Sequence, residues 1–375
     1  MAALPSTTRA FGAPSRYVQG RDELKNIKSY SAVFGKRVLI LLDVFFYDTY
    51  ISFFEEIYND GESKIRVEAF GGETTEKEIL RVTALADAME ANVVVGMGGG
   101  KTMDTAKAVA DNRGAAVIIV PTTASTDAPT ISLSVLYSEA GEHLRARHYH
   151  KNPDFVLLDT AIIAKAPIRF IVAGMGDALS TYVEARANQQ SSSANYIGKG
   201  YQRTLAAMAI AKACHETILG KGVGAKIAAE NGLCTPELED VIEANTLLSG
   251  LGVQNTSCAG AHSIAEGLTV LPACAKLLHG EAVAFGILVQ LIIEGRPAEE
   301  VRQMYDFFDA VGLPTTFADL RIPNATPEDI MKVAEASLQS YWDVEPFCVN
   351  AQMVSDAIFM ANALGVRNKT NSVRR

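Results

Sequence analysis

The stretch that decides the fold is N-V-V-V-G-M-G-G-G-K-T-M-D-T-A-K, residues Asn92–Lys107. It starts with an apolar run of strand length, Asn92–Met97, and helix-forming residues follow the glycines. Because Gly98, Gly99 and Gly100 lack Cβ atoms, an anion can approach the backbone where the helix N–H groups and dipole point at it. The stretch is neither G-x-G-x-x-G nor a full Walker A motif. It predicts a strand, a glycine loop and a helix that bind a diphosphate, with a tight turn that binds nothing as the alternative.

Further apolar runs of strand length alternate with helical patterns in the first half of the chain. The expected strands are Arg37–Asp43, Lys64–Phe70, Ala115–Val120 and Phe155–Asp159, and the expected helices are Thr75–Glu90 and Asp104–Asp111. Continuous Val, Ile and Leu runs separated by helices indicate a parallel sheet that is covered on both faces. We therefore expect residues 1–162 to form an α/β domain.

Strand signals fade after Lys165, and helical patterns take over. Helices are expected at Gly174–Asn188, Tyr201–Leu219, Pro236–Gly250, His262–Thr269, Gly280–Glu294, Ala298–Val311, Pro327–Leu338 and Asn350–Leu364. The chain therefore divides near Ala161–Pro167, and residues 163–375 are expected to form an all-helical domain. A length of 375 residues also favours two domains over one core.

The composition is that of an ordinary globular enzyme. A net charge of −9 argues against nucleic acid or an anionic membrane as the main partner, and no run approaches the roughly 18 apolar residues of a membrane span. The five cysteines are odd in number and contain no C-x-x-C pair, which argues against a disulfide framework and favours a reducing, cytoplasmic compartment.

The segment Met1–Arg16 carries Ser, Thr and Arg but no acid. We interpret it as a disordered arm, with a transit peptide as the alternative.

Polar side chains follow two of the predicted strands, at the edge of a parallel sheet where ligands bind. Asp43 can accept hydrogen bonds from ribose hydroxyls and would repel a 2′-phosphate, which favours NAD over NADP; a helix cap is the alternative. In P-T-T-A-S-T-D-A-P, the hydroxyls of Thr122, Thr123 and Ser125 could reach the same cofactor. Asp127 could hydrogen-bond a substrate hydroxyl, although the stretch also suits an ordinary turn before a proline.

Three possible metal ligands stand out in the second half: Asp177 in G-M-G-D-A-L, His262 in G-A-H-S and His279 in L-L-H-G-E. A catalytic zinc site uses three protein ligands and leaves one position for water or substrate. Two neutral imidazoles and one carboxylate leave a net positive metal, which acidifies an alcohol. Such a set also suits Fe²⁺, and each histidine could instead be a helix cap or a core residue. Together with the glycine loop, the set predicts metal-assisted alcohol oxidation by NAD.

The remaining reactive side chains receive less specific interpretations. His143, His148 and His150 lie in a charged stretch and are expected on a solvated face. Cys258 and Cys274 bracket His262, so a metal role is the alternative for them, but small apolar residues surround them, which suits buried core thiols. No Ser-His-Asp or Cys-His set stands out, so a hydrolase with a covalent intermediate is not supported.

Several segments together resemble the glycerol dehydrogenase group of the metal-containing (iron-type) alcohol dehydrogenase family. They are F-G-G-E (Phe70–Glu73), G-G-G-K-T-M-D-T-A-K, P-T-T-A-S-T-D-A-P, G-M-G-D-A-L, I-E-A-N-T-L-L-S-G (Ile242–Gly250), G-A-H and H-G-E-A-V-A-F-G. They occur in family order and span roughly Ser15–Gly365. Any one of them is a weak signal, and the ordered set is a strong one.

The resemblance implies an N-terminal Rossmann-like NAD-binding domain and a C-terminal helical metal-binding domain, in the architecture of dehydroquinate synthase. It implies that Asp177, His262 and His279 are zinc ligands and that Asp127 holds the hydroxyl of a small polyol. The implied NAD contacts are Asp43, Gly98, Gly99, Gly100, Lys101, Thr102, Thr122, Thr123, Ser125, Leu133 and Tyr137. It also implies a homo-oligomer, often an octamer in this group.

The implied reaction is the NAD- and zinc-dependent oxidation of glycerol, or a related 1,2-diol, to the ketone dihydroxyacetone or its analogue. The chain departs from the family at Val253–Cys258, where a phenylalanine and glycines are usual, at Ala265 and Glu266, at Ile131 and at Tyr341–Val349. The replacement of the usual phenylalanine by Val253, together with the pair Gln254 and Asn255, keeps a hydroxy acid or hydroxyketone substrate as the alternative. A phosphate-eliminating cyclase would need more Lys and Arg near Asp177 and His262, and a non-catalytic scaffold would leave the metal set without a purpose.

Overall fold

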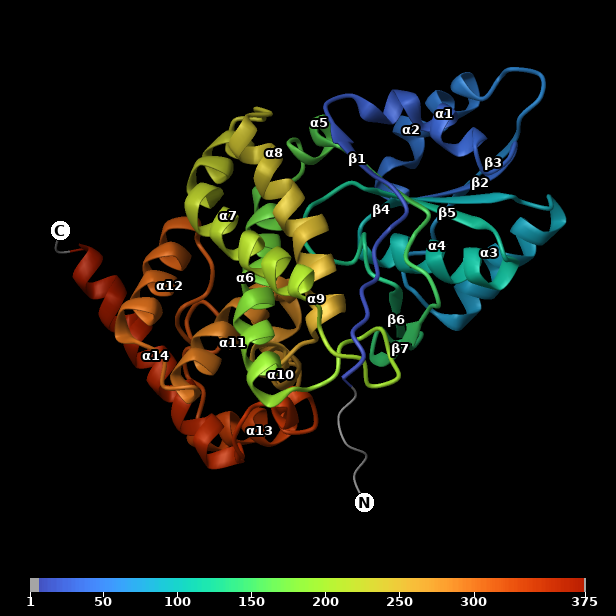
Figure 1. Ribbon diagram of the computed structural model, residues 1–375. Helices are drawn as coiled ribbons and strands as arrows, with labels where there is room; N and C mark the ends of the chain where they lie inside the picture. Colours follow the sequence, from blue (N-terminus) through green and yellow to red (C-terminus); the bar gives the residue numbers. More distant parts are fainter. Residues whose placement is uncertain (1–6, 374–375) are drawn as a thin grey trace.

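A six-stranded parallel sheet with helices on both faces makes up the first half of the chain (Figure 1). The computed structural model describes residues 7–373. In spatial order the strands are β1 (Tyr17–Gly20), β8 (Phe155–Asp159), β5 (Ala116–Pro121), β4 (Val93–Gly98), β2 (Arg37–Leu42) and β3 (Lys64–Ala69). Every neighbouring pair is parallel. The predicted α/β first half is therefore confirmed.

Alternate residues of the central strands pack into different cores on the two faces of the sheet. The covering helices are α1 (Ile27–Ala32), α2 (Val44–Ile57), α3 (Glu76–Ala88) and α4 (Gly100–Arg113). Leu39 and Leu41 of β2 pack into the core that contains α3 and α4, whereas Val38 and Ile40 pack into the core that contains α1 and α2. Burial of each such side chain contributes about 1.5–3 kcal/mol. This two-sided burial explains why the strands are continuous apolar runs.

The structure contains several elements that the sequence patterns do not predict. These are β1, α2 and an antiparallel hairpin of β6 (Leu133–Tyr137) with β7 (His143–His148). All but one of the β7 residues are exposed, so the hairpin has no apolar alternation that would announce it. His143, His148 and His150 are exposed, as expected.

The second half of the described chain is all-helical, as predicted. Its helices are α5 (Thr160–Ile163), α6 (Ile168–Ser191), α7 (Leu205–Glu230), α8 (Pro236–Glu243), a π-helical turn η2 (Ala244–Leu248), α9 (Ser249–Thr256), α10 (Gly260–Leu268), α11 (His279–Ile293), α12 (Ala298–Val311), α13 (Pro327–Ser337) and α14 (Ala351–Val373). The change from strands to helices falls at Asp159, close to the expected boundary at residue 162. Helices α6, α10 and α11 pack against one another and carry the three expected metal ligands.

The N-terminal stretch runs along the junction of the two halves (Figure 1). Arg9 pairs with Gln202 in a parallel bridge. The Gly12 N–H donates to Asn255 Oδ1 at 2.8 Å, and Asn255 Nδ2 donates to the Gly12 carbonyl at 2.9 Å. The interpretation as a disordered arm is therefore wrong for residues 8–12, because Gln202 pairs with the first part of this segment and the buried Asn255 binds Gly12. Residues 1–6 of the expected arm lie outside the described residues.

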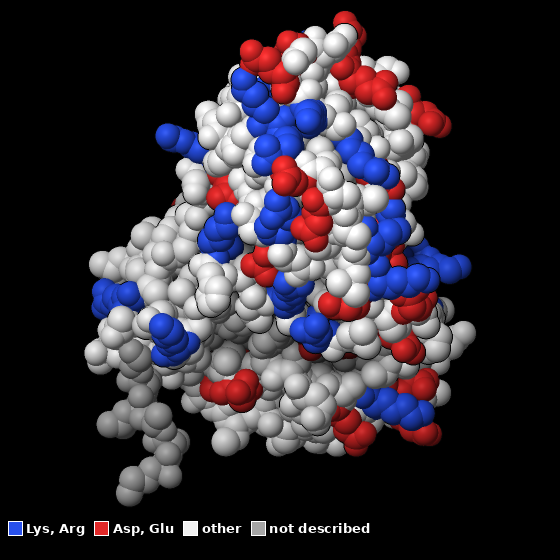
Figure 2. Space-filling view, turned by 90° about the vertical axis from the view of Figure 1, so that its right-hand side faces the viewer, with Lys and Arg blue, Asp and Glu red and all other residues white. Residues whose placement is uncertain are grey.

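Charges of both signs are interspersed on the side of the molecule that Figure 2 shows. Lys and Arg side chains neighbour Asp and Glu side chains across this face, which is formed mainly by the α/β half. Within residues 7–373, none of the helices is long and apolar enough to cross a membrane.

Candidate active site

Three adjacent strand ends form one edge of the site. β2, β4 and β5 are neighbours, and backbone hydrogen bonds continue just past their ends: Asp43 N–H donates to the Met97 carbonyl at 3.0 Å, and Thr122 N–H donates to the Gly98 carbonyl at 3.1 Å. Asp43 Oδ1 accepts the Phe45 N–H and caps α2. Its Oδ2 accepts the Thr102 hydroxyl at 3.3 Å. The helix cap considered as the alternative for Asp43 is thus present, and the carboxylate still lies beside the glycine loop.

The three loop glycines differ in what surrounds them. A Cβ on Gly98 would lie 2.6 Å from Thr102 Oγ1 and 2.9 Å from Asp43 Cβ, so this glycine is required by close packing. A Cβ on Gly99 or Gly100 would meet nothing within 4 Å. Gly99 has φ of −80°, which any residue adopts, so the fold itself does not require a glycine there. The open space and the N-terminus of α4 together leave room for a phosphate group.

The other expected cofactor contacts lie around this loop. The Thr123 and Ser125 hydroxyls are 3.1 Å apart. Lys101 Nζ is 2.5 Å from Glu73 Oε2 and 4.9 Å from the centre of the Tyr137 ring, so it links the glycine loop to the end of β6. Leu133 begins β6.

A buried ion pair on α4 holds the loop that carries Asp127. Lys107 Nζ donates to Asp104 Oδ1 at 2.9 Å and to the carbonyls of Ala128 and Leu133, each at 2.8 Å. Asp104 Oδ2 in turn accepts a backbone N–H of β6 at 2.9 Å. The D-T-A-K part of the glycine motif therefore positions the neighbouring loop and hairpin, a role that sequence reasoning did not assign.

Asp177, His262 and His279 come together as a possible metal site. Asp177 Oδ1 is 3.7 Å from His262 Nε2 and 3.4 Å from His279 Nε2, and the imidazole centroids are 5.2 Å apart. Asp177 is 1% exposed, and its Oδ1 has no hydrogen-bond partner among the described residues. A buried carboxylate oxygen without a partner is costly, and a cation between these three groups would satisfy it.

Glu184 orients one of the two histidines. Its Oε2 lies 2.8 Å from His262 Nδ1, and its Oε1 accepts the Ala259 and His262 N–H groups at 2.8 and 3.0 Å. Because a carboxylate can only accept, Nδ1 carries the proton and Nε2 is free to bind a metal. Sequence reasoning missed Glu184. It lies seven residues after Asp177, two turns along α6 on the same helix face, and that spacing was the available signal.

Asp127 joins the site from the other half of the molecule. Its N–H donates to Asp177 Oδ2 at 3.3 Å. Burial and the nearby Asp177 carboxylate raise the pKa of Asp127. Although burial raises the pKa of Asp177, His279 and His262 lower it further, so that its pKa lies below the usual value. The Asp177 carboxylate therefore stays charged beside a group that more easily holds a proton.

A second group that could hold a metal consists of Glu184, Cys258 and His262. It shares His262 with the first group, and Glu184 already accepts three hydrogen bonds there. Cys274 lies elsewhere, with its thiol near the Leu320 carbonyl. The Asp177 set, with its unpartnered oxygen, is the better metal site.

Gln254 and Asn255, two of the residues that favoured a hydroxy acid, are engaged in other contacts. Gln254 Oε1 accepts the Ser132 N–H and Asn152 Nδ2, each at 2.7 Å. Asn255 binds the Gly12 backbone and also donates to the Leu251 carbonyl at 2.8 Å. Both side chains therefore tie the two halves of the molecule together, and neither is free to bind a substrate carboxylate.

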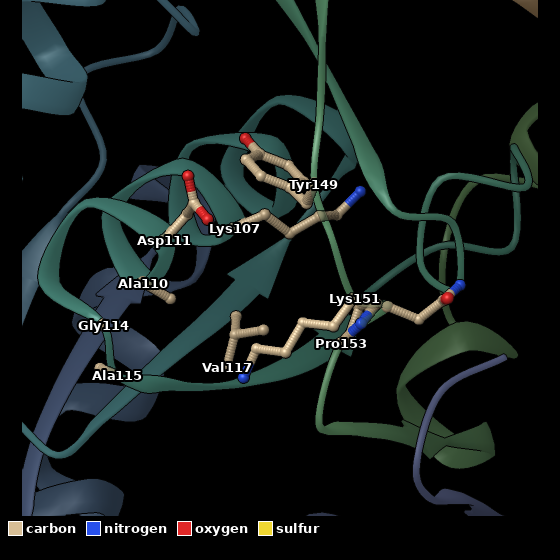
Figure 3. Close-up of a pocket in the computed structure, with 10 residues that line it drawn as sticks. Lys107, Ala110, Asp111, Gly114, Ala115, Val117, Tyr149, Lys151 and Pro153 are labelled. Carbon is tan, nitrogen blue, oxygen red and sulfur yellow. The ribbon is translucent and has the colours of Figure 1, made fainter. Parts of the chain in front are cut away.

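The cavity in Figure 3 lies away from this site. It has a volume of about 190 Å³ and is lined by the second half of α4, the start of β5 and residues 149–153. The glycine loop is at the opposite end of α4. The cavity is therefore not where a cofactor on the glycine loop would bind.

Open space beside Gly99 and Gly100 at a parallel sheet edge, together with a possible three-ligand metal site, is the arrangement expected of a metal- and nicotinamide-dependent oxidoreductase. The family model "Iron-containing alcohol dehydrogenase" matches residues 14–160. A glycerol dehydrogenase of Thermotoga maritima is 43% identical over 97% of this chain and 99% of its own length. The crystal structure of a probable glycerol dehydrogenase from Sinorhizobium meliloti is 44% identical, with a TM-score of 0.89 over 96% of this chain and 100% of that one. The structure of glycerol dehydrogenase from Schizosaccharomyces pombe is 33% identical, with a TM-score of 0.93 over 98% and 94%.

This chain belongs to the iron-containing alcohol dehydrogenase family and is an oxidoreductase. The resemblance drawn from the ordered motifs is thereby confirmed. Family and site together imply a divalent metal and a nicotinamide cofactor. The residues present fit both groups: the unpartnered Asp177 oxygen fits the cation, and the open space at Gly99 and Gly100 fits a phosphate.

Proposed function

We propose that this protein oxidises glycerol and related 1,2-diols at a secondary hydroxyl, with NAD as the acceptor and zinc as the metal. The observation that carries the proposal is the buried, unpartnered Asp177 oxygen between two histidines. The names of the full-length relatives support glycerol as the substrate. The overall reaction is diol plus NAD⁺ giving hydroxyketone, NADH and one proton.

The proposed division of labour follows from the geometry. Asp177, His262 and His279 would hold the metal, which supplies the positive charge that acidifies the substrate hydroxyl while the nicotinamide accepts the hydride. Glu184 keeps His262 in the tautomer that can bind the metal. Asp127 would hold the neighbouring hydroxyl. We expect the hydroxyl proton to leave through water.

The cofactor contacts are part of the same proposal. Gly98, Gly99 and Gly100 with Lys101 and Thr102 would surround the diphosphate. Asp43 would accept the ribose hydroxyls, and its charge would exclude a 2′-phosphate. The contacts proposed further along the cofactor are Thr122, Thr123, Ser125, Leu133 and Tyr137. We also expect a homo-oligomer, which light scattering coupled to size-exclusion chromatography would measure.

The test combines metal analysis with a substrate screen. Purified protein is assayed for NAD reduction with glycerol, 1,2-propanediol, 2-hydroxy acids and simple alcohols, before and after chelation and after return of Zn²⁺ or Fe²⁺. We expect diol-dependent NADH formation that chelation abolishes and one metal restores. Unchanged turnover in protein shown to be metal-free would refute the metal role. Turnover of hydroxy acids but not of diols would refute the substrate class.

A further inference from the structure

A π-helical turn interrupts the long helix that ends near the metal site. η2, Ala244–Leu248, joins α8 to α9 without a break in the chain of helical residues. A π-turn inserts one extra residue, widens the helix and releases polar groups from the regular hydrogen-bond ladder, and such turns are frequent at functional sites. Polar groups of η2 bind segments outside the helix.

One side chain of η2 contacts both halves of the active site. Asn245 Nδ2 donates to the Ala124 carbonyl at 2.9 Å and to the Ile171 carbonyl at 3.0 Å, and the side chain is fully buried. Ala124 precedes Asp127 in the loop after β5, and Ile171 lies near the start of α6, the helix that carries Asp177. Asn245 thus joins the two segments that bring these carboxylates together.

The next residue of η2 holds the same loop on its far side. The Thr130 hydroxyl donates to the Thr246 carbonyl at 2.8 Å, and both residues are fully buried. The Thr246 hydroxyl is 3.1 Å from the Tyr17 hydroxyl of β1. Asp127 therefore lies between two anchor points, Ala124 and Thr130, both bound to η2.

Glycines bring the loop close to the helices. A Cβ on Gly174 of α6 would lie 2.0 Å from the Ala124 carbonyl oxygen. A Cβ on Gly250 of α9 would lie 2.0 Å from Thr130 Oγ1 and 2.7 Å from the Asp127 carbonyl oxygen. The loop after β5 therefore packs directly against the backbone of α6 and α9. Its hydrogen bonds to η2 then fix the position of Asp127 relative to the possible metal ligands.

We propose that Thr130 and Asn245 are positioning residues, through which the π-turn sets the placement of Asp127 relative to Asp177, His262 and His279. This inference rests on the proposed function, in which Asp127 holds a substrate hydroxyl. Loss of an anchor shifts Asp127, and misplacement of a contact group by about 1 Å can cost up to a hundredfold in rate. The Thr130 anchor lies beyond Asp127 from the proposed cofactor contacts at Thr122–Ser125, so its loss is expected to act on the diol rather than on NAD.

The test compares Thr130→Val with Thr130→Ser, because valine keeps the shape and removes the hydroxyl whereas serine keeps the hydroxyl. We expect Thr130→Val to lower kcat/KM for the diol by about tenfold to a hundredfold, with the KM for NAD and the metal content unchanged, and Thr130→Ser to restore most of the loss. Thr83→Val is the control, since Thr83 of α3 also donates to a carbonyl, that of Ile79, at 2.7 Å, far from the site. Equal kinetics for Thr130→Val and wild type would overturn the inference.

A double-mutant cycle with Asp127→Asn separates positioning from general damage. If Thr130 acts through Asp127, Thr130→Val adds less than twofold once Asp127 is already changed; a full additional loss would overturn the inference. If Asp127→Asn alone leaves diol oxidation intact, the proposed role of Asp127 fails, which is a separate result. Should Thr130→Val not fold, Asn245→Ser, which removes the two bonds to Ala124 and Ile171, takes its place in the same cycle.

Discussion

Glu184→Gln tests how the protein prepares His262 for a metal. The substitution preserves the shape of a fully buried side chain and replaces one oxygen by an NH₂ group. The amide oxygen can take the place of Oε1 and keep the two backbone N–H bonds to residues 259 and 262. The NH₂ group then faces His262 Nδ1, which must accept, so the imidazole proton moves to Nε2, the nitrogen that faces Asp177.

The opposite orientation of the amide would avoid this proton shift but is itself unfavourable. It would set the NH₂ group against two backbone donors, and each buried donor left without an acceptor costs about 1–3 kcal/mol. Substitutions of such metal-orienting partners typically cost a factor of about 10 to 100 in metal affinity. At about 1.4 kcal/mol per factor of ten, the metal binds about 1.4 to 2.8 kcal/mol more weakly.

The assay is metal affinity measured by competition with a chromophoric chelator, followed by kcat at saturating metal. Glu266→Gln is the matched control, since it makes the same charge change on α10 but contacts Ser340 rather than His262. We expect this control to bind metal like the wild type. Equal metal affinity in Glu184→Gln and wild type would show that the tautomer of His262 is set by something other than Glu184.

Three further predictions follow from the cofactor edge and from a buried acid. Gly99→Ala should weaken NAD binding by about tenfold while protein stability stays unchanged or rises slightly, because the added Cβ meets only open space. The control Gly220→Ala, at an equally open position on α7, should leave NAD binding unaltered. A destabilised Gly99→Ala protein would contradict this prediction. Asp43→Ser keeps a capping oxygen for α2 but removes the charge, so the NADP-to-NAD ratio of kcat/KM should rise; an unchanged ratio would contradict the ribose role. Burial, Glu294 and Glu184 raise the pKa of Glu345 to about 8, so its contribution to stability is complete below its unfolded pKa and is lost as the pH rises through 8. The free energy of unfolding of Glu345→Gln relative to wild type should therefore rise by about 2 kcal/mol from pH 6 to pH 8, whereas the exposed control Glu335→Gln should show no such trend in urea melts.

The sequence predicts those parts of the site that consecutive residues or unusual residue types mark. The glycine loop can be recognised because a strand, three glycines and a helix are consecutive in the chain. Asp177, His262 and His279 stand out because such residues are rare in apolar helical surroundings, and the structure brings them together as a possible metal site. Their roles in binding remain predictions for the experiments above.

The parts that the sequence did not predict depend on partners far along the chain. Glu184 shares a face of α6 with Asp177, but its partner His262 is 78 residues away, and only the packing of α6 against α10 shows that the two side chains meet. Gln254 and Asn255 suggested a polar substrate pocket, but their partners are 102 and 243 residues away. The hairpin strand β7 is exposed, so burial left no periodic pattern in its sequence.

Contacts between residues that are far apart in the chain also determine the order in which the molecule can assemble during synthesis. Gly12 binds Asn255, and β1 pairs with β8 at the edge of the sheet. At about 5–20 residues per second, the 243 residues that separate Gly12 from Asn255 take roughly 12 to 50 s to translate. For that time Gly12 lacks its native partner in the helical half, although Arg9 can already pair with Gln202. The junction between the halves is therefore completed late, after the sheet and the first helices of the second half have been made.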